Sequence, residues 1–93
     1  MKNINIIKIR KKLDKLDIKL LRVIKERTHL VDQIVGLKIN KNEIIDKKRI
    51  NFILKKIKEN SMKIKVDPKI TVNIWKVMIK GFINYEFRKF KKK

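Results

Sequence analysis

The chain has 93 residues, of which 28 are Lys or Arg and 9 are Asp or Glu, giving a formal net charge of +19 at pH 7. This length predicts a single domain covering residues 1–93. The absence of cysteine excludes a disulfide framework and a thiolate metal site. The single histidine, His29, has no companion ligand, and the sequence shows no cluster of metal ligands, so no metal site is expected.

A charge this large is typical of proteins that contact nucleic acid or an acidic surface. The composition offers a simpler interpretation, because the chain contains 23 Lys, 18 Ile and 8 Asn and no Ala, as the codons of an AT-rich genome favour. The lysines are spread over every segment, and no helix gathers Arg, Asn and Gln for base recognition. A nucleic-acid partner is therefore not expected, although a basic helical dimer that binds nucleic acid stays an alternative.

No apolar run approaches the ~20 residues that a membrane span requires. The opening MKNINIIKIRKK has a basic start but neither an adequate apolar centre nor a small-residue cleavage site, so it does not resemble a signal peptide. No membrane association is expected, and the default location is the cytoplasm.

The first expected element is a long helix from about Asn5 to Lys38 or Ile39. Its apolar residues recur in alternating steps of three and four, which is typical of a helix packed along its whole length. They are Ile6, Ile9, Leu13, Leu16, Leu20, Val23, Leu30, Ile34 and Leu37. Arg27 fills the slot between Val23 and Leu30, where a guanidinium is unfavourable unless it meets an anion. Arg27 is therefore the first candidate ligand-binding residue.

The length of this helix predicts more than one chain. About 34 residues at ~1.5 Å per residue make a rod of roughly 50 Å. A compact domain of this size is only ~30 Å across, so one chain cannot cover the rod. We infer a helical oligomer, most simply a dimer.

Two other cations are related to Arg27 by helical geometry. Lys38 follows it by 11 residues, so both side chains project from nearly the same face, roughly 16 Å apart at the backbone. Together they could hold one small dianion. Arg10 precedes Arg27 by 17 residues and lies about 25 Å away, rotated by roughly 100°. Arg10 cannot reach the same ligand from its own chain, but it could do so from an antiparallel partner helix.

A second helix is expected over about Lys47–Asn60, with Asp46 as its N-cap. Arg49 falls in the first turn, where a cation is unfavourable. Arg49 is thus either a ligand contact or an ordinary surface residue, and these two interpretations stay open. A connection is expected over Ser61–Val66.

A third helix is expected from Pro68 to about Phe90, with Asp67 as its N-cap. Glu86 lies late in this helix, at the margin of an apolar face. It is either a functional carboxyl group or the partner of Lys89 or Arg88. Three helices and no strand pattern predict an all-α fold.

At this point the sequence resembles the all-helical, AroQ-class chorismate mutases over nearly the whole chain. The resemblance lies in the order and spacing of particular residues. The matching fragments are Arg10, Leu16-Asp17 with Leu20-Leu21, Glu26-Arg27, Val35-Gly36-Leu37-Lys38, Asp46 with Arg49, Val66-Asp67 and Glu86.

The resemblance implies three helices per chain, a long N-terminal helix and an intertwined homodimer whose two active sites each use both chains. It implies an isomerase that rearranges chorismate to prephenate in phenylalanine and tyrosine biosynthesis. Lys38, Glu86 and Arg27 are the implied catalytic residues. By match, the two carboxylates of chorismate are bound by Arg27 and by Arg10 of the partner subunit. Lys38 would bind a carboxylate and the ether oxygen, and Glu86 would bind the ether oxygen. Asp46 would contact the ring-hydroxyl region, and Arg49 would add positive charge.

The reaction needs no nucleophile, metal or cofactor, because it is an intramolecular rearrangement. The enzyme has to hold a compact conformer and stabilise charge that develops on the ether oxygen. Lys38 can donate a hydrogen bond to that oxygen at neutral pH. Glu86 can donate one only when its carboxyl group is protonated, so activity is expected to fall as the pH rises.

Two residues depart from the family pattern. Ile50 stands where the family usually has Glu, and Phe82 stands where it usually has Ser. Losing these polar contacts is expected to weaken substrate binding rather than abolish activity. An isochorismate pyruvate lyase of the same fold and a catalytically degenerate homologue stay open as alternatives.

Overall fold

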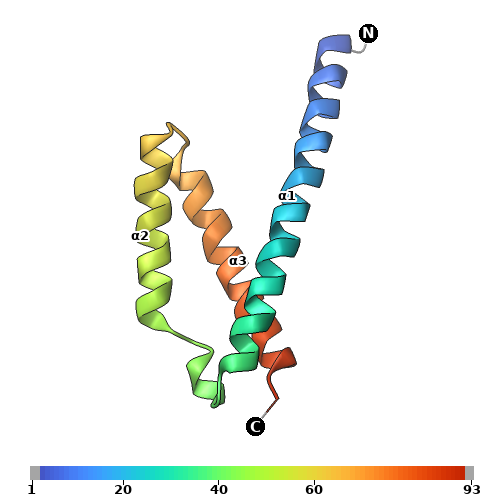
Figure 1. Ribbon diagram of the computed structural model, residues 1–93. Coiled ribbons are helices and arrows are strands. Elements are labelled where there is room, and N and C mark those ends of the chain that lie inside the picture. The colour runs from blue at the N-terminus through green and yellow to red at the C-terminus, as the bar shows by residue number, and fades with distance from the viewer. Residues whose placement is uncertain (1–2, 92–93) are drawn as a thin grey trace. The chain divides into compact units, whose positions relative to one another are not determined.

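The computed structural model describes residues 3–91 and contains α1 (Ile4–Leu37), the 3₁₀ turn η1 (Lys41–Glu43), α2 (Lys47–Lys63) and α3 (Pro68–Lys89) (Figure 1). The described residues include no strand, so the prediction of an all-α chain with a long N-terminal helix is confirmed. None of the described helices combines the length and the hydropathy that a membrane-spanning segment requires.

The chain divides into two units, one ending at Leu30 and the other beginning at Val31. The first unit contains a single helix, which is the part of α1 up to Leu30. Asn3 caps this helix, because its side-chain oxygen accepts from the backbone N–H groups of Asn5, at 3.0 Å, and Ile6, at 3.4 Å. The apolar residues that recur in steps of three and four form a seam along α1. The seam residues of this unit are exposed, namely Ile6, Ile9, Leu13, Leu16, Leu20, Val23 and Leu30.

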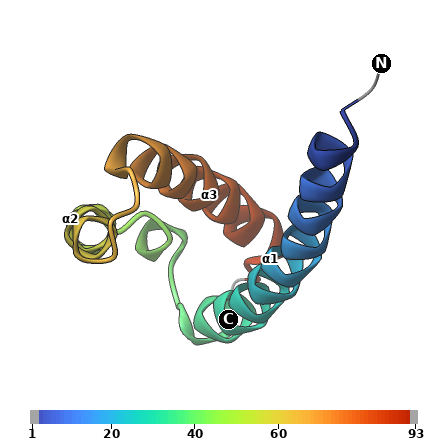
Figure 2. The ribbon, with the colours of Figure 1, turned by 90° about the horizontal axis from the view of Figure 1, so that it is seen from above.

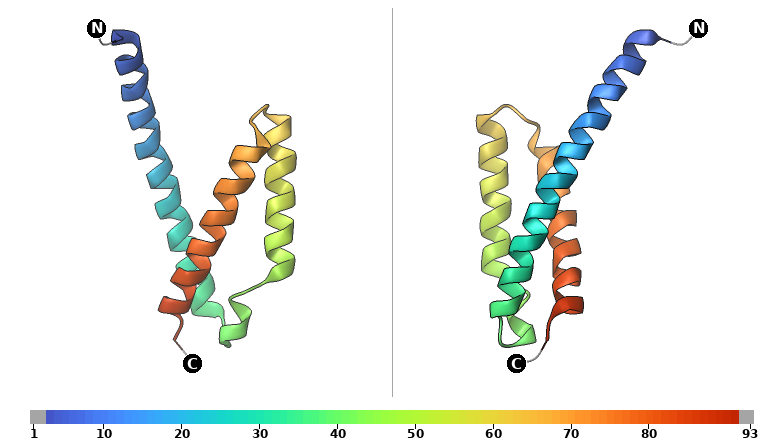
Figure 3. Two further views of the ribbon diagram at one scale, coloured as in Figure 1. Left: turned by 180° about the vertical axis from the view of Figure 1, so that it is seen from behind. Right: turned by 45° about the vertical axis from the view of Figure 1, so that its right-hand side comes forward.

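The second unit contains the end of α1, η1, α2 and α3. α2 and α3 contact each other, are closest at the turn that joins them and diverge toward their other ends (Figures 1 and 3). Seen down α2, α3 extends away from it at an angle (Figure 2). At the closed end the Ser61 and Thr71 hydroxyl oxygens lie 2.6 Å apart, and the Ser61 hydroxyl group also lies 2.6 Å from the Ile57 carbonyl oxygen.

The expected end of α2 at Asn60 is wrong, because the helix continues to Lys63. Lys65 adopts a left-handed conformation, with φ of 62°. The Lys65 N–H then donates to the Met62 carbonyl oxygen and the Val66 N–H to that of Ser61, which closes the helix. Glycine usually occupies this position, and a lysine there costs about 1 kcal/mol. A glycine-based signal for the helix end is therefore missing from the sequence.

Both predicted helix starts in this unit are confirmed. The Asp46 side chain accepts from the Arg49 N–H at 3.0 Å and begins α2. Asp67 does the same for the Lys69 N–H at 2.9 Å, with Pro68 in the first position of α3. α3 ends at Lys89, one residue before the expected end.

The second unit has a small core. Val35 and Ile44 are its buried apolar residues, whereas Ser61 and Glu86 are buried polar ones. α3 leaves an apolar stripe exposed at Ile70, Ile74 and Val77. These residues are four and three positions apart, which places them on one side of the helix.

Candidate active site

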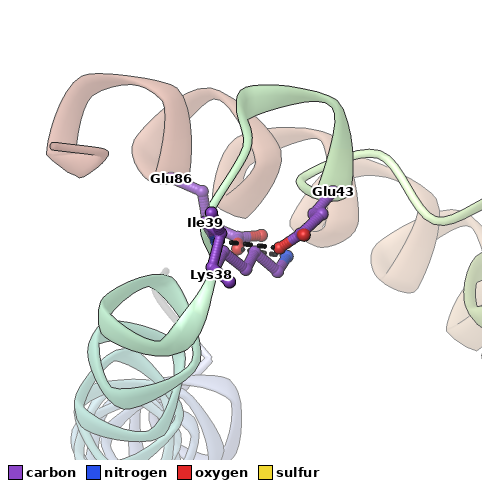
Figure 4. A network of polar contacts seen from close by, with 4 residues as sticks. All are labelled: Lys38, Ile39, Glu43 and Glu86. Carbon is purple, nitrogen blue, oxygen red and sulfur yellow. Dashed lines mark hydrogen bonds and ion pairs between the residues drawn. The ribbon is translucent and has the colours of Figure 1, made fainter. Parts of the chain in front are cut away.

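The side chains of Lys38 and Glu86 form an ion pair in which Nζ lies 2.9 Å from Oε1 (Figure 4). Lys38 is the first residue after α1, and Glu86 lies in the last turn of α3. Their side chains are only 18% and 11% exposed. Because water screens such a pair poorly, its attraction is stronger than that of a surface ion pair. The structure thus brings together two residues that the sequence singled out.

The backbone that carries Lys38 is held in place from both sides. The Lys38 N–H donates to the Val35 carbonyl oxygen at 3.2 Å. The next N–H, of Ile39, donates to Oε2 of Glu43 at 3.0 Å (Figure 4). Glu43 was missed by the sequence reading, although an Asn three residues before a Glu, here Asn40 and Glu43, resembles the capping-box pattern that would have indicated it.

Glu86 is buried, with 8% of its surface exposed. Its carbonyl oxygen accepts the Phe90 N–H at 2.8 Å, in the last turn of α3. The sequence left Lys89 and Arg88 open as local partners for its carboxylate. In the structure the charged ends of those two side chains instead lie over the Tyr85 ring, each 5.7 Å from its centre.

Tyr85 makes a second contact between α3 and the end of α1. Its hydroxyl group donates to Oδ1 of Asp32 at 2.7 Å. That hydrogen bond is the main cause that raises the pKa of Tyr85 above its ordinary value of 10.0. Partial burial and the negative charge of Asp32 raise the pKa further, and the positive charge of Arg88 opposes them. The sequence carries no signal for this contact, because its partners are 53 residues apart.

Asp46 and Arg49 have structural partners of their own. Asp46 caps α2 by accepting the Arg49 N–H. The guanidinium of Arg49 lies over the Phe52 ring, 5.2 Å from its centre. In the described part of the chain neither side chain forms a hydrogen bond or an ion pair with Lys38 or Glu86. The structure therefore does not bring them to that pair, and their roles in binding stay predictions.

The two departures from the family pattern are apolar and half-buried. Phe82 lies one turn before Glu86, and its ring meets the Tyr85 ring edge to face at 6.4 Å. Ile50 lies in the first turn of α2. Neither side chain can accept a hydrogen bond from a substrate hydroxyl group.

Arg10 and Arg27 both lie on α1 in the unit that ends at Leu30. Arg10 is exposed and Arg27 is half-buried. Seventeen residues of continuous helix separate them by about 25 Å, too far for both to bind one small molecule. Within one chain the structure therefore does not bring these two predicted carboxylate-binding residues together.

The contact between Tyr85 and Asp32 can be tested by alkaline titration, because Tyr85 is the only tyrosine and tyrosinate absorbance reports it alone. The neutral phenol donates to Asp32, whereas the phenolate cannot donate and is repelled. Since the pKa is raised in the folded chain, the contact stabilises the fold below the ordinary pKa and is lost as the pH rises through the raised one.

We expect Asp32→Asn to lower the pKa of Tyr85 relative to wild type, because the amide accepts the hydrogen bond without carrying charge. The control is Asp14→Asn, which changes the net charge equally at an exposed position of α1. Equal titration of the wild type and both variants would contradict the contact.

Comparison with known proteins identifies the family. The family model for chorismate mutase type II matches residues 9–87. No curated protein and no solved structure matches the chain. The match covers most of the sequence and includes every residue of the candidate site, from Arg10 to Glu86. The chain therefore belongs to the chorismate mutase type II family.

Proposed function

We propose that this chain rearranges chorismate to prephenate and serves phenylalanine and tyrosine biosynthesis in the cytoplasm. The observation that supports it best is the shielded pair of Lys38 and Glu86, in a chain of the chorismate mutase family. The ether C–O bond of chorismate breaks while a new C–C bond forms, so no atom is gained or lost. The protein has only to orient the substrate and stabilise the ether oxygen.

Lys38 is the proposed donor to the ether oxygen. In the structure its ammonium group donates to Glu86 at 2.9 Å. With substrate bound, the ether oxygen takes this place, and the developing negative charge strengthens the hydrogen bond from Lys38. A hydrogen bond that strengthens in the transition state raises kcat rather than merely lowering KM.

Glu86 is the proposed second donor to the same oxygen. An ion pair requires its carboxylate form, which accepts hydrogen bonds but cannot donate one. Protonation both creates this donor and releases Lys38 from the ion pair. Low pH therefore favours the reactive arrangement.

Binding of the two substrate carboxylates is assigned to Arg27 and to Arg10 of the partner subunit. Asp46 is assigned to the ring-hydroxyl region, and Arg49 adds positive charge. Ile50 and Phe82 replace polar residues, whose contacts with the substrate would be made in both the ground state and the transition state. Their proposed effect is therefore a raised KM with little change in kcat.

The proposed partner is a second copy of the chain, forming an intertwined homodimer. α1 contains 34 residues and is therefore longer than α3, which contains 22, and α2, which contains 17. The exposed seam of α1 and the exposed stripe at Ile70, Ile74 and Val77 of α3 supply apolar surface for a long helix of another chain. An antiparallel second copy would also supply the Arg10 that one chain cannot bring to its own Arg27.

Arg27→Ala tests the assigned reaction. Loss of a half-buried guanidinium that holds a substrate carboxylate should lower kcat/KM by at least about 100-fold. The assay is the loss of chorismate absorbance with the product identified. Arg22→Ala removes one arginine from an exposed position of the same helix and should keep near-wild-type activity.

The product separates the alternatives. Prephenate supports the mutase, whereas salicylate and pyruvate would assign an isochorismate pyruvate lyase when isochorismate is supplied. No turnover by a folded wild-type protein would mean that Ile50 and Phe82 mark a degenerate site. Salt-dependent binding of nucleic acid that survives Arg27→Ala would then favour the basic-surface alternative.

Glu86→Gln tests the role of the carboxyl group. The wild type should lose activity as the pH rises toward and above neutral, because only a protonated carboxyl group can donate to the ether oxygen. The glutamine amide donates at every pH and forms no ion pair with Lys38, so the activity of this variant should be nearly independent of pH over that range. A variant that keeps the wild-type pH profile would refute the role of Glu86.

A further inference from the structure

We propose that Tyr85 is a positioning residue, which holds Glu86 against Lys38 through its hydrogen bond to Asp32. The catalytic consequence of this inference rests on the proposed function, whereas the positioning itself does not. The four residues lie near the C-terminal ends of α1 and α3, within the second unit.

The two contacts form a two-point attachment. Tyr85 and Glu86 are consecutive on α3, so their side chains leave the helix about 100° apart. Their partners are six residues apart, since Asp32 lies in α1 and Lys38 directly follows the helix. The hydrogen bond of 2.7 Å and the ion pair of 2.9 Å thus restrain α3 at two separated points. One contact alone would restrain this end of α3 at a single point.

Tyr85 is the more rigid of the two attachments. Its ring has two side-chain torsions and is packed on the Phe82 ring, with the cations of Arg88 and Lys89 over it. Lys38, by contrast, carries its charge on a flexible four-carbon chain. A rigid donor on a charged acceptor gives a short and directional hydrogen bond. The geometry therefore assigns orientation to Tyr85 and charge to Lys38.

The position of Glu86 matters because both groups are assigned to one oxygen atom. A displacement of about 1 Å at a reacting centre can cost about 100-fold in rate. Tyr85 is not among the candidate site residues that the sequence indicates. The direct contact with Asp32 gives its hydroxyl group a role.

The kinetic test compares Tyr85→Phe in the wild type and in a Glu86→Ala background. The phenylalanine keeps the ring and removes the hydroxyl group. In the wild type, kcat should fall about fivefold, the equivalent of one exposed hydrogen bond, while KM stays nearly unchanged. In the Glu86→Ala background kcat should hardly change, because no carboxyl group is left to position. The same fall in both backgrounds would show a merely structural role and overturn the proposal.

Two variants of Asp32, the acceptor of the hydrogen bond, test whether the bond itself matters. Asp32→Asn keeps an oxygen that accepts from the Tyr85 hydroxyl group, so kcat should stay near wild type. Asp32→Ala removes the acceptor and should reproduce the loss seen in Tyr85→Phe. Equal losses in both Asp32 variants, with unchanged helix content, would contradict positioning through the hydrogen bond.

The acetylation rate of Lys38 tests the positioning by Tyr85 without an activity assay. Acetylation with limiting acetic anhydride should modify Lys38 slowly in the wild type, because its amine is paired and only 18% of its side chain is exposed. Tyr85→Phe should raise the Lys38 rate several-fold. Lys56 is the matched control, since it pairs with Glu59 at 3.8 Å but has a side chain 55% exposed, and its rate should not change.

The two readouts separate the two claims. If the wild type leaves chorismate unchanged, the proposed function fails, and the acetylation of Lys38 alone decides whether Tyr85 positions the pair. An unchanged Lys38 rate in Tyr85→Phe would overturn the positioning whether or not the wild type is a mutase.

Discussion

The ion pair between Lys38 and Glu86 joins residues 48 positions apart and determines where the last turn of α3 lies against the end of α1. Two partly buried charges lose hydration, and the pair is tolerated only because each is the partner of the other. Neighbouring contacts support both sides, with Glu43 holding the backbone beyond Lys38 and Asp32 holding Tyr85 beside Glu86. The same pair supplies the two groups that the proposed reaction places at the ether oxygen, so fold and chemistry depend on one contact.

Local signals account for the features of the fold that the sequence predicted. Asp46 and the Asp67-Pro68 pair begin their helices because a short acidic side chain satisfies free backbone N–H groups at a helix start. The alternating apolar steps predicted α1 to within two residues at either end. The end of α2 was not predictable in this way, because the left-handed position that closes it is occupied by Lys65, which carries no helix-ending signal.

The candidate site was only partly predictable. Helical spacing singled out Arg27 and Lys38 and separated Arg10 from them, whereas the catalytic roles of Lys38 and Glu86 came from the family resemblance. Spacing could not choose the partner of Glu86, since Arg88 and Lys89 are also within reach along the helix. That choice is made by the side chains that α3 and the end of α1 direct toward each other, and the contact between Tyr85 and Asp32 is of the same kind. Contacts between residues far apart in sequence leave no local pattern to read.

Mixing two inactive variants tests whether two chains share the proposed chorismate mutase site. Arg10→Ala and Arg27→Ala should each be nearly inactive alone. After subunit exchange at equal amounts, verified by native mass spectrometry, each mixed dimer should hold one intact site, and prephenate formation should recover to about a quarter of the wild-type level. Verified mixed dimers without activity, or full activity of Arg10→Ala alone, would contradict a site built from both chains.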